Sequence, residues 1–211
     1  MIPSKEEMYA ALEERHGKEL QKLFSETAVV ICGLGGLGSN VAISLARAGL
    51  GRIHLIDFDR VDISNLNRQQ YFPEQLGQYK ADALKDTLLK IAPYCDITSQ
   101  AVKLDEENIP VLLADFPIVC ECFDTAEQKA LLVNLVLENF PDKKLVAASG
   151  MAGLGSANSI VTKRIARNFW LCGDGKSDVN EGLGLISARV AVCAAHQATT
   201  VLRIISGKDE A

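Results

Sequence analysis

Three glycines at fixed spacing lie where the sequence is best suited to binding a phosphorylated nucleotide. Gly33, Gly35 and Gly38 follow the apolar run 28–32, and a helix-like segment opens with Ser39. Glycines in this position let the backbone approach a phosphate closely, and the N–H groups at the start of a helix attract an anion. The spacing therefore predicts a phosphate-binding turn between a strand and a helix.

A carboxylate at the end of the second apolar run suits the sugar of the same nucleotide. Asp57 follows Gly33 by 24 residues, counted from their numbers. In strand–helix–strand units of this kind, an acid at the carboxyl end of the second strand accepts hydrogen bonds from ribose hydroxyls. We therefore expect a nucleotide pocket, and glycines that serve only helix–sheet packing are the less favoured interpretation.

The loop and helix after this acid supply cations that a dinucleotide with its diphosphate does not need. Asn65, Arg68 and Gln69 lie in a polar loop, and Lys80 lies at the start of the next expected helix. A triphosphate carries more negative charge, which fixed cations offset best where water is excluded. This set favours ATP over NAD, so a NAD-dependent oxidoreductase is the less favoured alternative.

A further carboxylate is placed to hold a metal ion. Asp124 follows the apolar run 116–122, at the carboxyl edge where ligands of open α/β sheets gather. An isolated carboxylate there suits Mg²⁺, which keeps several waters and bridges to phosphate oxygens. The plainer alternative is a helix N-cap, with Thr125 beginning the helix, and one side chain can serve both roles.

The elements that must position these residues alternate between strand and helix. Apolar and alternating runs predict strands at 28–32, 52–58, 97–104, 116–122, 144–149 and 159–162. Helical periodicity predicts helices at 4–24, 39–50, 78–91, 105–114, 126–139 and 185–205. This alternation predicts a doubly wound, Rossmann-like α/β fold with a mainly parallel sheet and helices on both faces, whereas 163–183 is expected to be irregular.

Composition restricts the partners and the compartment. The net charge of −5 argues against nucleic acid and anionic membranes as partners, and the apolar runs are too short to cross a bilayer. None of the six cysteines belongs to a Cys-x-x-Cys pair, so no structural zinc is expected. The charged N-terminus is unlike a signal peptide, and we expect a reduced, cytoplasmic protein.

Together these motifs resemble the ThiF/MoeB/ubiquitin-activating enzyme superfamily, and most closely its short ThiF-like sulfur carrier protein adenylyltransferases. The motifs that carry the resemblance occur in order at 33–39, 57–59, 64–69, 77–80 and 122–124. The resemblance implies one adenylylating domain over 1–211, made of an N-terminal helix (1–26), a nucleotide-binding core (27–150) and a crossover region with the C-terminal helix (151–211).

The resemblance also implies roles for individual residues. Those expected to bind the nucleotide are Gly33, Gly35, Gly36, Gly38, Asp57, Asp59, Asn65, Arg68 and Lys80. Arg68 and Lys80 would neutralise the triphosphate during the reaction, and Asp124 would hold Mg²⁺. Members of the family use an N-terminal arginine that reaches the phosphate across a dimer, and Arg15 lies in about the corresponding place.

The reaction that the resemblance implies is ATP-dependent adenylylation of a partner protein. The partner would be a small ubiquitin-like sulfur carrier ending in Gly-Gly, whose carboxylate attacks ATP and displaces pyrophosphate, in thiamine synthesis or a related sulfur-transfer route. Because the partner supplies the nucleophile, the work of the enzyme would be positioning and charge neutralisation. A homodimer is implied as well. A non-catalytic module of the same fold that recruits a carrier is the second alternative.

Two features depart from many relatives or leave a role open. The chain lacks the Cys-x-x-Cys pairs that hold zinc in many of them, and Cys172 is the only thiol in the region where some relatives link covalently to the carrier. A structural thiol beside Trp170 is the favoured interpretation of Cys172, because no Lys, Arg or His flanks it closely. His196 is interpreted as a packed or interface histidine rather than a base.

Overall fold

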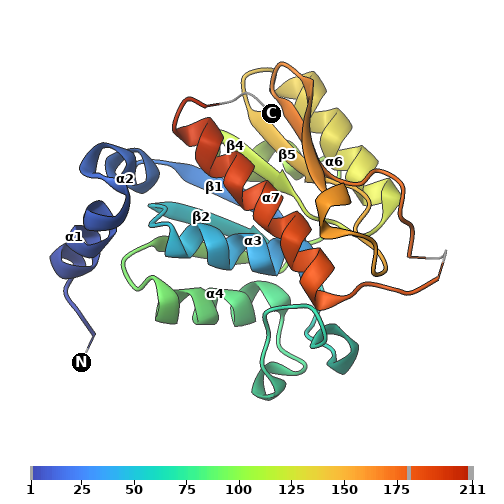
Figure 1. Cartoon of the computed structure of the whole chain (residues 1–211), viewed down its shortest axis with the longest axis horizontal. Coiled ribbons are helices and arrows are strands. Elements are labelled where there is room, and N and C mark those ends of the chain that lie inside the picture. Colours follow the sequence, from blue (N-terminus) through green and yellow to red (C-terminus); the bar gives the residue numbers. More distant parts are fainter. Residues whose placement is uncertain (1, 180–181, 209–211) are drawn as a thin grey trace.

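The computed structural model describes residues 2–179 and 182–208, which are built around one seven-stranded sheet (Figure 1). The strands are β1 (Ala28–Cys32), β2 (Arg52–Ile56), β3 (Asp96–Gln100), β4 (Ile118–Glu121), β5 (Lys144–Ala148), β6 (Val161–Ala166) and β7 (Phe169–Gly173). Their order is β3-β2-β1-β4-β5-β7-β6, and every neighbouring pair except β6–β7 is parallel. The prediction of a doubly wound, mainly parallel α/β fold is confirmed.

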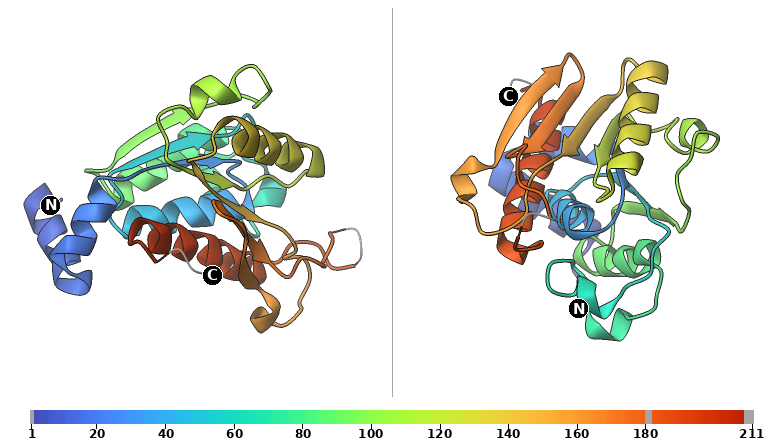
Figure 2. Two further views of the ribbon diagram at one scale, coloured as in Figure 1. Left: turned by 90° about the horizontal axis from the view of Figure 1, so that it is seen from above. Right: turned by 90° about the vertical axis from the view of Figure 1, so that its right-hand side faces the viewer.

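Helices cover both faces of the sheet, as Figure 2 shows from two further sides. One face carries α3 (Gly36–Arg47), α4 (Lys80–Ile91) and α7 (Ser187–Ile205), and the other carries α5 (Ile109–Leu112) and α6 (Ala126–Asn139). Strand β1 faces both layers, because successive side chains of a strand point to opposite sides. Val29 and Ile31 join the hydrophobic core beneath α3, α4 and α7, which we call the first core. Val30 and Cys32 join the second core, which lies beneath α5 and α6.

The stretch 163–183 is more ordered than its sequence predicts. Strands β6 and β7 form an antiparallel hairpin, and β7 adds to the parallel sheet beside β5. The buried Trp170 packs from β7 into the first core. The expectation of an irregular segment is wrong for 163–173, because β6 is an edge strand whose exposed, charged residues carry no apolar alternation, but 174–179 and 182–183 contain no helix or strand.

The N-terminal helix is interrupted, and several strands are shorter than predicted, β3 the most. The range 4–24 divides into α1 (Lys5–His16) and α2 (Lys18–Ser25), because Gly17 adopts a φ of +92° and ends the first helix. Strand β3 stops at Gln100 and not at 104, since its only partner β2 ends there in register. Within the described residues, no helix is long and apolar enough to cross a membrane.

Close packing of α3 on β1 depends on Gly38. A Cβ at this position would lie 1.9 Å from the carbonyl oxygen of Gly33, which belongs to the backbone and cannot move aside. We expect Gly38→Ala to lower the free energy of unfolding by about 3 kcal/mol. As a control, Gly184→Ala adds its methyl group to open space and is expected to change stability by less than about 0.5 kcal/mol. Urea denaturation of both variants measures the difference, and equal midpoints would contradict the packing.

Candidate functional site

The predicted glycine turn joins β1 to α3 at the carboxyl edge of the sheet. Gly33 has a φ of +87°, and a Cβ there would lie 2.9 Å from the main-chain carbon and oxygen of Cys122. The helix begins at Gly36, three residues before the predicted Ser39, with Gly35 as its N-cap. The first N–H groups of α3 have no partners within the helix and are therefore available to an anion.

Asp57 joins the end of β2 to the glycine turn through hydrogen bonds. One carboxylate oxygen accepts a hydrogen bond from the N–H of Leu34 at 2.6 Å, and the other accepts from the N–H of Asp59 at 2.8 Å. The residue is only 7% exposed. Burial raises the pKa of the Asp57 carboxyl above its ordinary value of 3.8, and the Lys80 ammonium opposes this shift. Asp57 therefore lies beside the glycine turn, and its role in binding a ribose stays a prediction.

Lys80 and Asp59 form an ion pair next to Asp57. The Lys80 Nζ lies 2.8 Å from a carboxylate oxygen of Asp59, and the lysine side chain is only 8% exposed. Lys80 is the first residue of α4, and its N–H donates to the carbonyl oxygen of Asp59 at 2.9 Å. The expectation that Lys80 lies in the first turn of a helix is confirmed. Asp59 contributes by orienting the ammonium group.

The polar loop after β2 folds back over the glycine turn, as the sequence predicts for a triphosphate site. The side chain of Arg68 lies across Gly36, whose Cβ would be 3.4 Å from the arginine Cγ. One guanidinium nitrogen of Arg68 donates to the carbonyl oxygen of Ser64 and to the Oδ1 of Asn67, at 3.0 and 2.8 Å. These contacts hold the guanidinium to its own loop, while the aliphatic part of the side chain lies over the first turn of α3.

Asn40 and Ser39 of α3 hold the loop that carries Arg68 in place, a role that was not predicted from the sequence. The Asn40 amide donates to the carbonyl oxygens of Gly36 and Arg68, at 2.7 and 3.3 Å. The Ser39 hydroxyl accepts from the N–H of Gln70 at 3.2 Å. The signal that could have revealed them is their position directly after the glycine turn, at the start of a helix.

Two buried polar atoms at the turn have no hydrogen-bond partner among the described residues. They are the Nε of Arg68 and the Oε1 of Gln69, and the amide nitrogen of Gln69 would lie 3.7 Å from a Cβ at Gly35. Buried polar groups are normally paired, so these two atoms are exceptions within the candidate site. Asn65 is used differently, because its Oδ1 accepts from the N–H of Asp62 and caps the short helix Ile63–Asn65.

Asp124 lies on the turn between β4 and α6 and faces solvent. It has no hydrogen-bond or ion-pair partner within 2–179 and 182–208, and the N-cap of α6 is Thr125, so the N-cap interpretation of Asp124 is wrong. The turn adjoins the glycine turn, because Phe123 Cδ1 would lie 2.9 Å from a Cβ at Gly33. The described residues contain no cluster of three metal-binding side chains. Asp124 therefore fits Mg²⁺ only with phosphate and water as the other ligands.

A buried ion pair behind Asp124 was missed by the sequence analysis. The Lys129 ammonium lies 3.1 Å from both carboxylate oxygens of Glu121 and 2.9 Å from the carbonyl oxygen of Ala148. Burial raises the pKa of Glu121, and the neighbouring Lys129 opposes that shift. The pair joins the ends of β4 and β5 and so supports the turn that carries Asp124. An acid at the end of an apolar run was the available signal.

Three other predicted residues lie away from the glycine turn. Arg15 is exposed on α1, which lies at the opposite end of the molecule from the loop 57–79 (Figure 1), beside Gly49 and Tyr94. Arg15 therefore does not serve the site of its own chain, and its role in trans stays a prediction. His196 is packed on α7, with its Nδ1 3.0 Å from the Thr162 hydroxyl.

Cys172 is a buried structural residue. It lies in β7 with no exposed surface, in contact with the Thr162 hydroxyl at 3.5 Å. Burial raises the pKa of its thiol, although the Thr162 and Thr200 hydroxyls oppose that shift. This burial agrees with the favoured interpretation of Cys172 as a structural thiol, because the segment is a strand of the sheet.

The fold is an α/β fold with a mainly parallel sheet, and the glycine turn, Asp57, Arg68 and Lys80 lie at or after the carboxyl ends of its first two strands. The chain belongs to the ThiF family, which matches residues 9–211. Molybdopterin-synthase adenylyltransferase of Escherichia coli is 38% identical over 105 residues, 49% of this chain and 42% of that protein. The adenylyltransferase and sulfurtransferase UBA4 of Candida glabrata is 29% identical over 225 positions, which cover 98% of this chain and 51% of that protein.

Solved structures share the whole fold at lower identity. The tRNA N6-threonylcarbamoyladenosine dehydratase TcdA of Escherichia coli, solved in complex with ATP, has a TM-score of 0.87 at 21% identity. That comparison covers 99% of this chain and 98% of the other. MccB of Escherichia coli has a TM-score of 0.71 at 22% identity and covers 90% of this chain and 59% of the other. The chain spans about a third to a half of the length of the curated relatives it matches.

The burial of the cysteines gives a direct chemical test. All six are free and buried, and burial raises the pKa of Cys95 and Cys193 to about 12. We expect iodoacetamide at neutral pH to label none of them in the folded protein and all six after denaturation, because only an accessible thiolate reacts. Mass spectrometry of tryptic peptides measures the labelling. Rapid modification of Cys172 in the folded protein would restore it as a candidate nucleophile.

Proposed function

We propose that this protein is an adenylyltransferase that uses ATP to activate the C-terminal glycine of a small ubiquitin-like sulfur carrier protein ending in Gly-Gly. The observation that carries the proposal is the position of Arg68, whose side chain lies over Gly36 with its Nε unpartnered. The buried side chain of Lys80 forms an ion pair with Asp59 beside Asp57. The names of the curated relatives, which are adenylyltransferases, support the same reaction class.

The geometry suits charge neutralisation during an in-line displacement. A carboxylate oxygen of the carrier forms a bond to the α-phosphorus of ATP, and the bond from that phosphorus to the bridging oxygen breaks. The electron pair leaves with pyrophosphate, so the chain needs no general base. Arg68 and Lys80 would bind the charged phosphates, since fixed cations in a site shielded from water stabilise developing charge. Asp124 would hold Mg²⁺, which supplies further positive charge for pyrophosphate when bound.

Three finer points belong to the same proposal. We infer that residues 1–211 act as one adenylylating domain, that two copies associate, and that Arg15 of one copy serves the site of the other. The location of Arg15 far from its own glycine turn supports a role in trans. The carrier is proposed to be ThiS-like and to act in thiamine synthesis, which rests on the family resemblance alone.

The direct test is mass spectrometry of candidate carriers after incubation with the protein, ATP and Mg²⁺. The expected product carries one added AMP on its C-terminal glycine, with pyrophosphate exchange that depends on the carrier. Stabilisation of the fold by ATP without transfer of AMP would instead indicate a binding module. Stabilisation by NADH and not by ATP would favour the oxidoreductase alternative.

Lys80 provides the sharpest single substitution. We expect Lys80→Ala to lower the adenylylation rate about 100-fold, which corresponds to about 3 kcal/mol for one lost preorganised charge. Lys90→Ala is the matched control, because Lys90 is exposed at the far end of the same helix. Pyrophosphate exchange at saturating ATP and carrier measures both. A loss below about tenfold in Lys80→Ala would rule out the assigned role.

Mixing two inactive variants tests whether Arg15 acts in trans. In a heterodimer of Arg15→Ala and Lys80→Ala, one site regains both native residues only if the arginine comes from the partner. We expect an equal mixture to recover roughly a quarter of the wild-type rate after subunit exchange. Activity no greater than that of the separate variants would show that Arg15 does not act across a dimer. Size-exclusion chromatography confirms that subunits have paired.

A further inference from the structure

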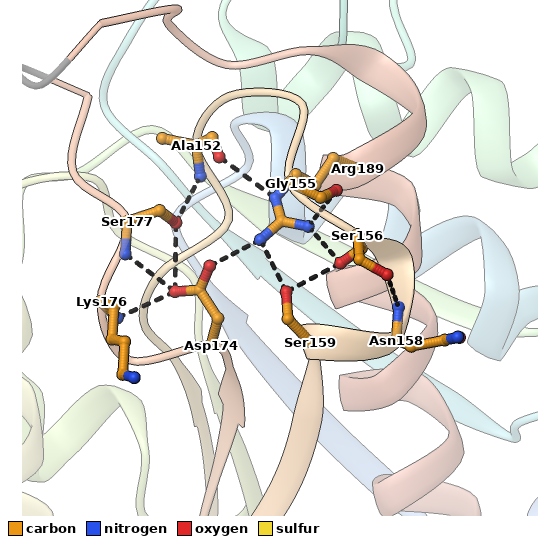
Figure 3. Close-up of polar contacts among 9 residues, drawn as sticks. All are labelled: Ala152, Gly155, Ser156, Asn158, Ser159, Asp174, Lys176, Ser177 and Arg189. Atoms are coloured by element: carbon orange, nitrogen blue, oxygen red, sulfur yellow. Dashed lines mark hydrogen bonds and ion pairs between the residues drawn. The ribbon is translucent and has the colours of Figure 1, made fainter.

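One arginine near the start of α7 is buried and donates from every nitrogen of its guanidinium. Arg189 is the third residue of the helix and only 5% exposed. Its Nε donates to the carbonyl oxygen of Ala152 at 3.1 Å, and its Nη1 donates to those of Gly155 and Ser156, both at 2.7 Å (Figure 3). The guanidinium therefore joins α7 to the turn that follows β5.

The remaining nitrogen joins the same arginine to the segment after β7. The Nη2 of Arg189 donates to a carboxylate oxygen of Asp174 at 2.5 Å and to the Ser159 hydroxyl at 3.1 Å. The other oxygen of Asp174 accepts from the N–H groups of Lys176 and Ser177 at 2.8 and 2.9 Å (Figure 3). Removal from water disfavours the ionised form, but these hydrogen bonds outweigh it and lower the pKa of Asp174 to about 2.

We call this cluster the Arg189 hub. It consists of Arg189, Asp174, Ser159, Ser177 and the main chain of 152–156. Its location is unfavourable by local rules, because a helix N-terminus repels a cation and burial of a charge is costly without full pairing. Such local conflicts concentrate at functional sites in natural proteins. The position of the hub therefore indicates a functional role and not only a stabilising one.

What the hub holds is one side of the candidate site. We call residues 150–155 and 183–185 the side wall. Within it, the N–H of Gly153 donates to the carbonyl oxygen of Gly184 at 3.0 Å, which ties the two segments together. The hub binds the first segment directly through the carbonyl oxygens of Ala152 and Gly155, and it binds the adjoining Ser156 through a third carbonyl oxygen.

The side wall reaches the nucleotide loop and the glycine turn. The Asn67 amide, next to Arg68, donates to the carbonyl oxygen of Leu185 at 3.2 Å. Val190, directly after Arg189, packs so closely on the turn that a Cβ at Gly36 would lie 2.9 Å from its Cγ1. The hub is thus linked through one residue to the phosphate-binding turn and through one loop to Arg68.

We propose that Arg189 is a positioning residue that holds the side wall where the extended C-terminal peptide of the carrier reaches the nucleotide. The inference rests on the proposed function. Arg189 touches no substrate itself, since all its donors are used within the hub. Its fork of planar donors is required, because a lysine cannot reproduce bonds to three carbonyls, a hydroxyl and a carboxylate at once.

The variants Arg189→Met and Asp174→Asn test the inference, the second being the gentler change. Disruption of the hub should loosen the chain at Lys176, so cleavage by trypsin after Lys176 should become at least about tenfold faster in the native protein. The KM for the carrier should rise about tenfold, with the kcat at saturating carrier and the stabilisation by ATP little changed. Arg189→Lys should resemble Arg189→Met more than wild type.

Arg52→Met is the control, because it removes an arginine ion pair with Asp96 at the opposite edge of the sheet. It should leave the cleavage after Lys176 and the KM for the carrier unchanged. Native resistance at Lys176 in a folded Asp174→Asn protein, or an unchanged KM for the carrier, would overturn this inference alone. Failure of the wild-type protein to transfer AMP to any carrier would overturn the proposed function, and this inference with it.

Discussion

The site depends on close approach of four chain segments where no Cβ atom intervenes. Gly33 lies against the end of β4, Gly36 against Arg68 and Val190, and Gly38 against the carbonyl oxygen of Gly33. Each approach would be blocked by a side chain of any size. The glycine turn therefore brings together the β4–α6 turn that carries Asp124, the loop that carries Arg68 and the helix α7. The chemistry proposed for the site is possible only because these contacts are made by backbone.

Charge is the second constraint on this edge of the sheet. Three ion pairs with at least one buried partner lie there, Lys80–Asp59, Lys129–Glu121 and Arg189–Asp174. Buried pairs of this kind add little net stability compared with apolar residues, but they fix geometry when all hydrogen bonds are satisfied. Each pair joins two different elements or loops at the carboxyl edge of the sheet. The edge is thus a preorganised polar frame, which suits a reaction whose catalysis is mainly electrostatic.

The two hydrophobic cores, one on each face of the sheet, keep this polar frame in position. Side chains of β1 alternate between the two, and α3 and α7 pack together over the first. Because α7 begins at the Arg189 hub and also packs on the glycine turn, one helix contacts both regions. The nucleotide side and the side wall are therefore parts of one framework and not separate loops.

Much of the fold and of the nucleotide site follows from local sequence. The strand, glycine turn, helix and acid at 28–57 are specified by short-range patterns, and so is the place of Lys80 at the start of α4. Boundaries were less predictable: Gly17 divided a helix that periodicity joins, and the charged edge strand β6 was hidden by its exposure. The burial of Cys172 was also hard to predict, because it results from the pairing of β7 with β5.

The sequence by itself determined which residue types are available and where the backbone turns, since both depend on neighbours within a few positions. Only the tertiary structure decided which charges are paired. Arg189 and Asp174 are fifteen residues apart, yet their link to 152–159 requires β5, β7 and α7 to meet. Arg68 reaches Gly36 for the same reason. Long-range pairing depends on how the cores pack, and no local pattern records it.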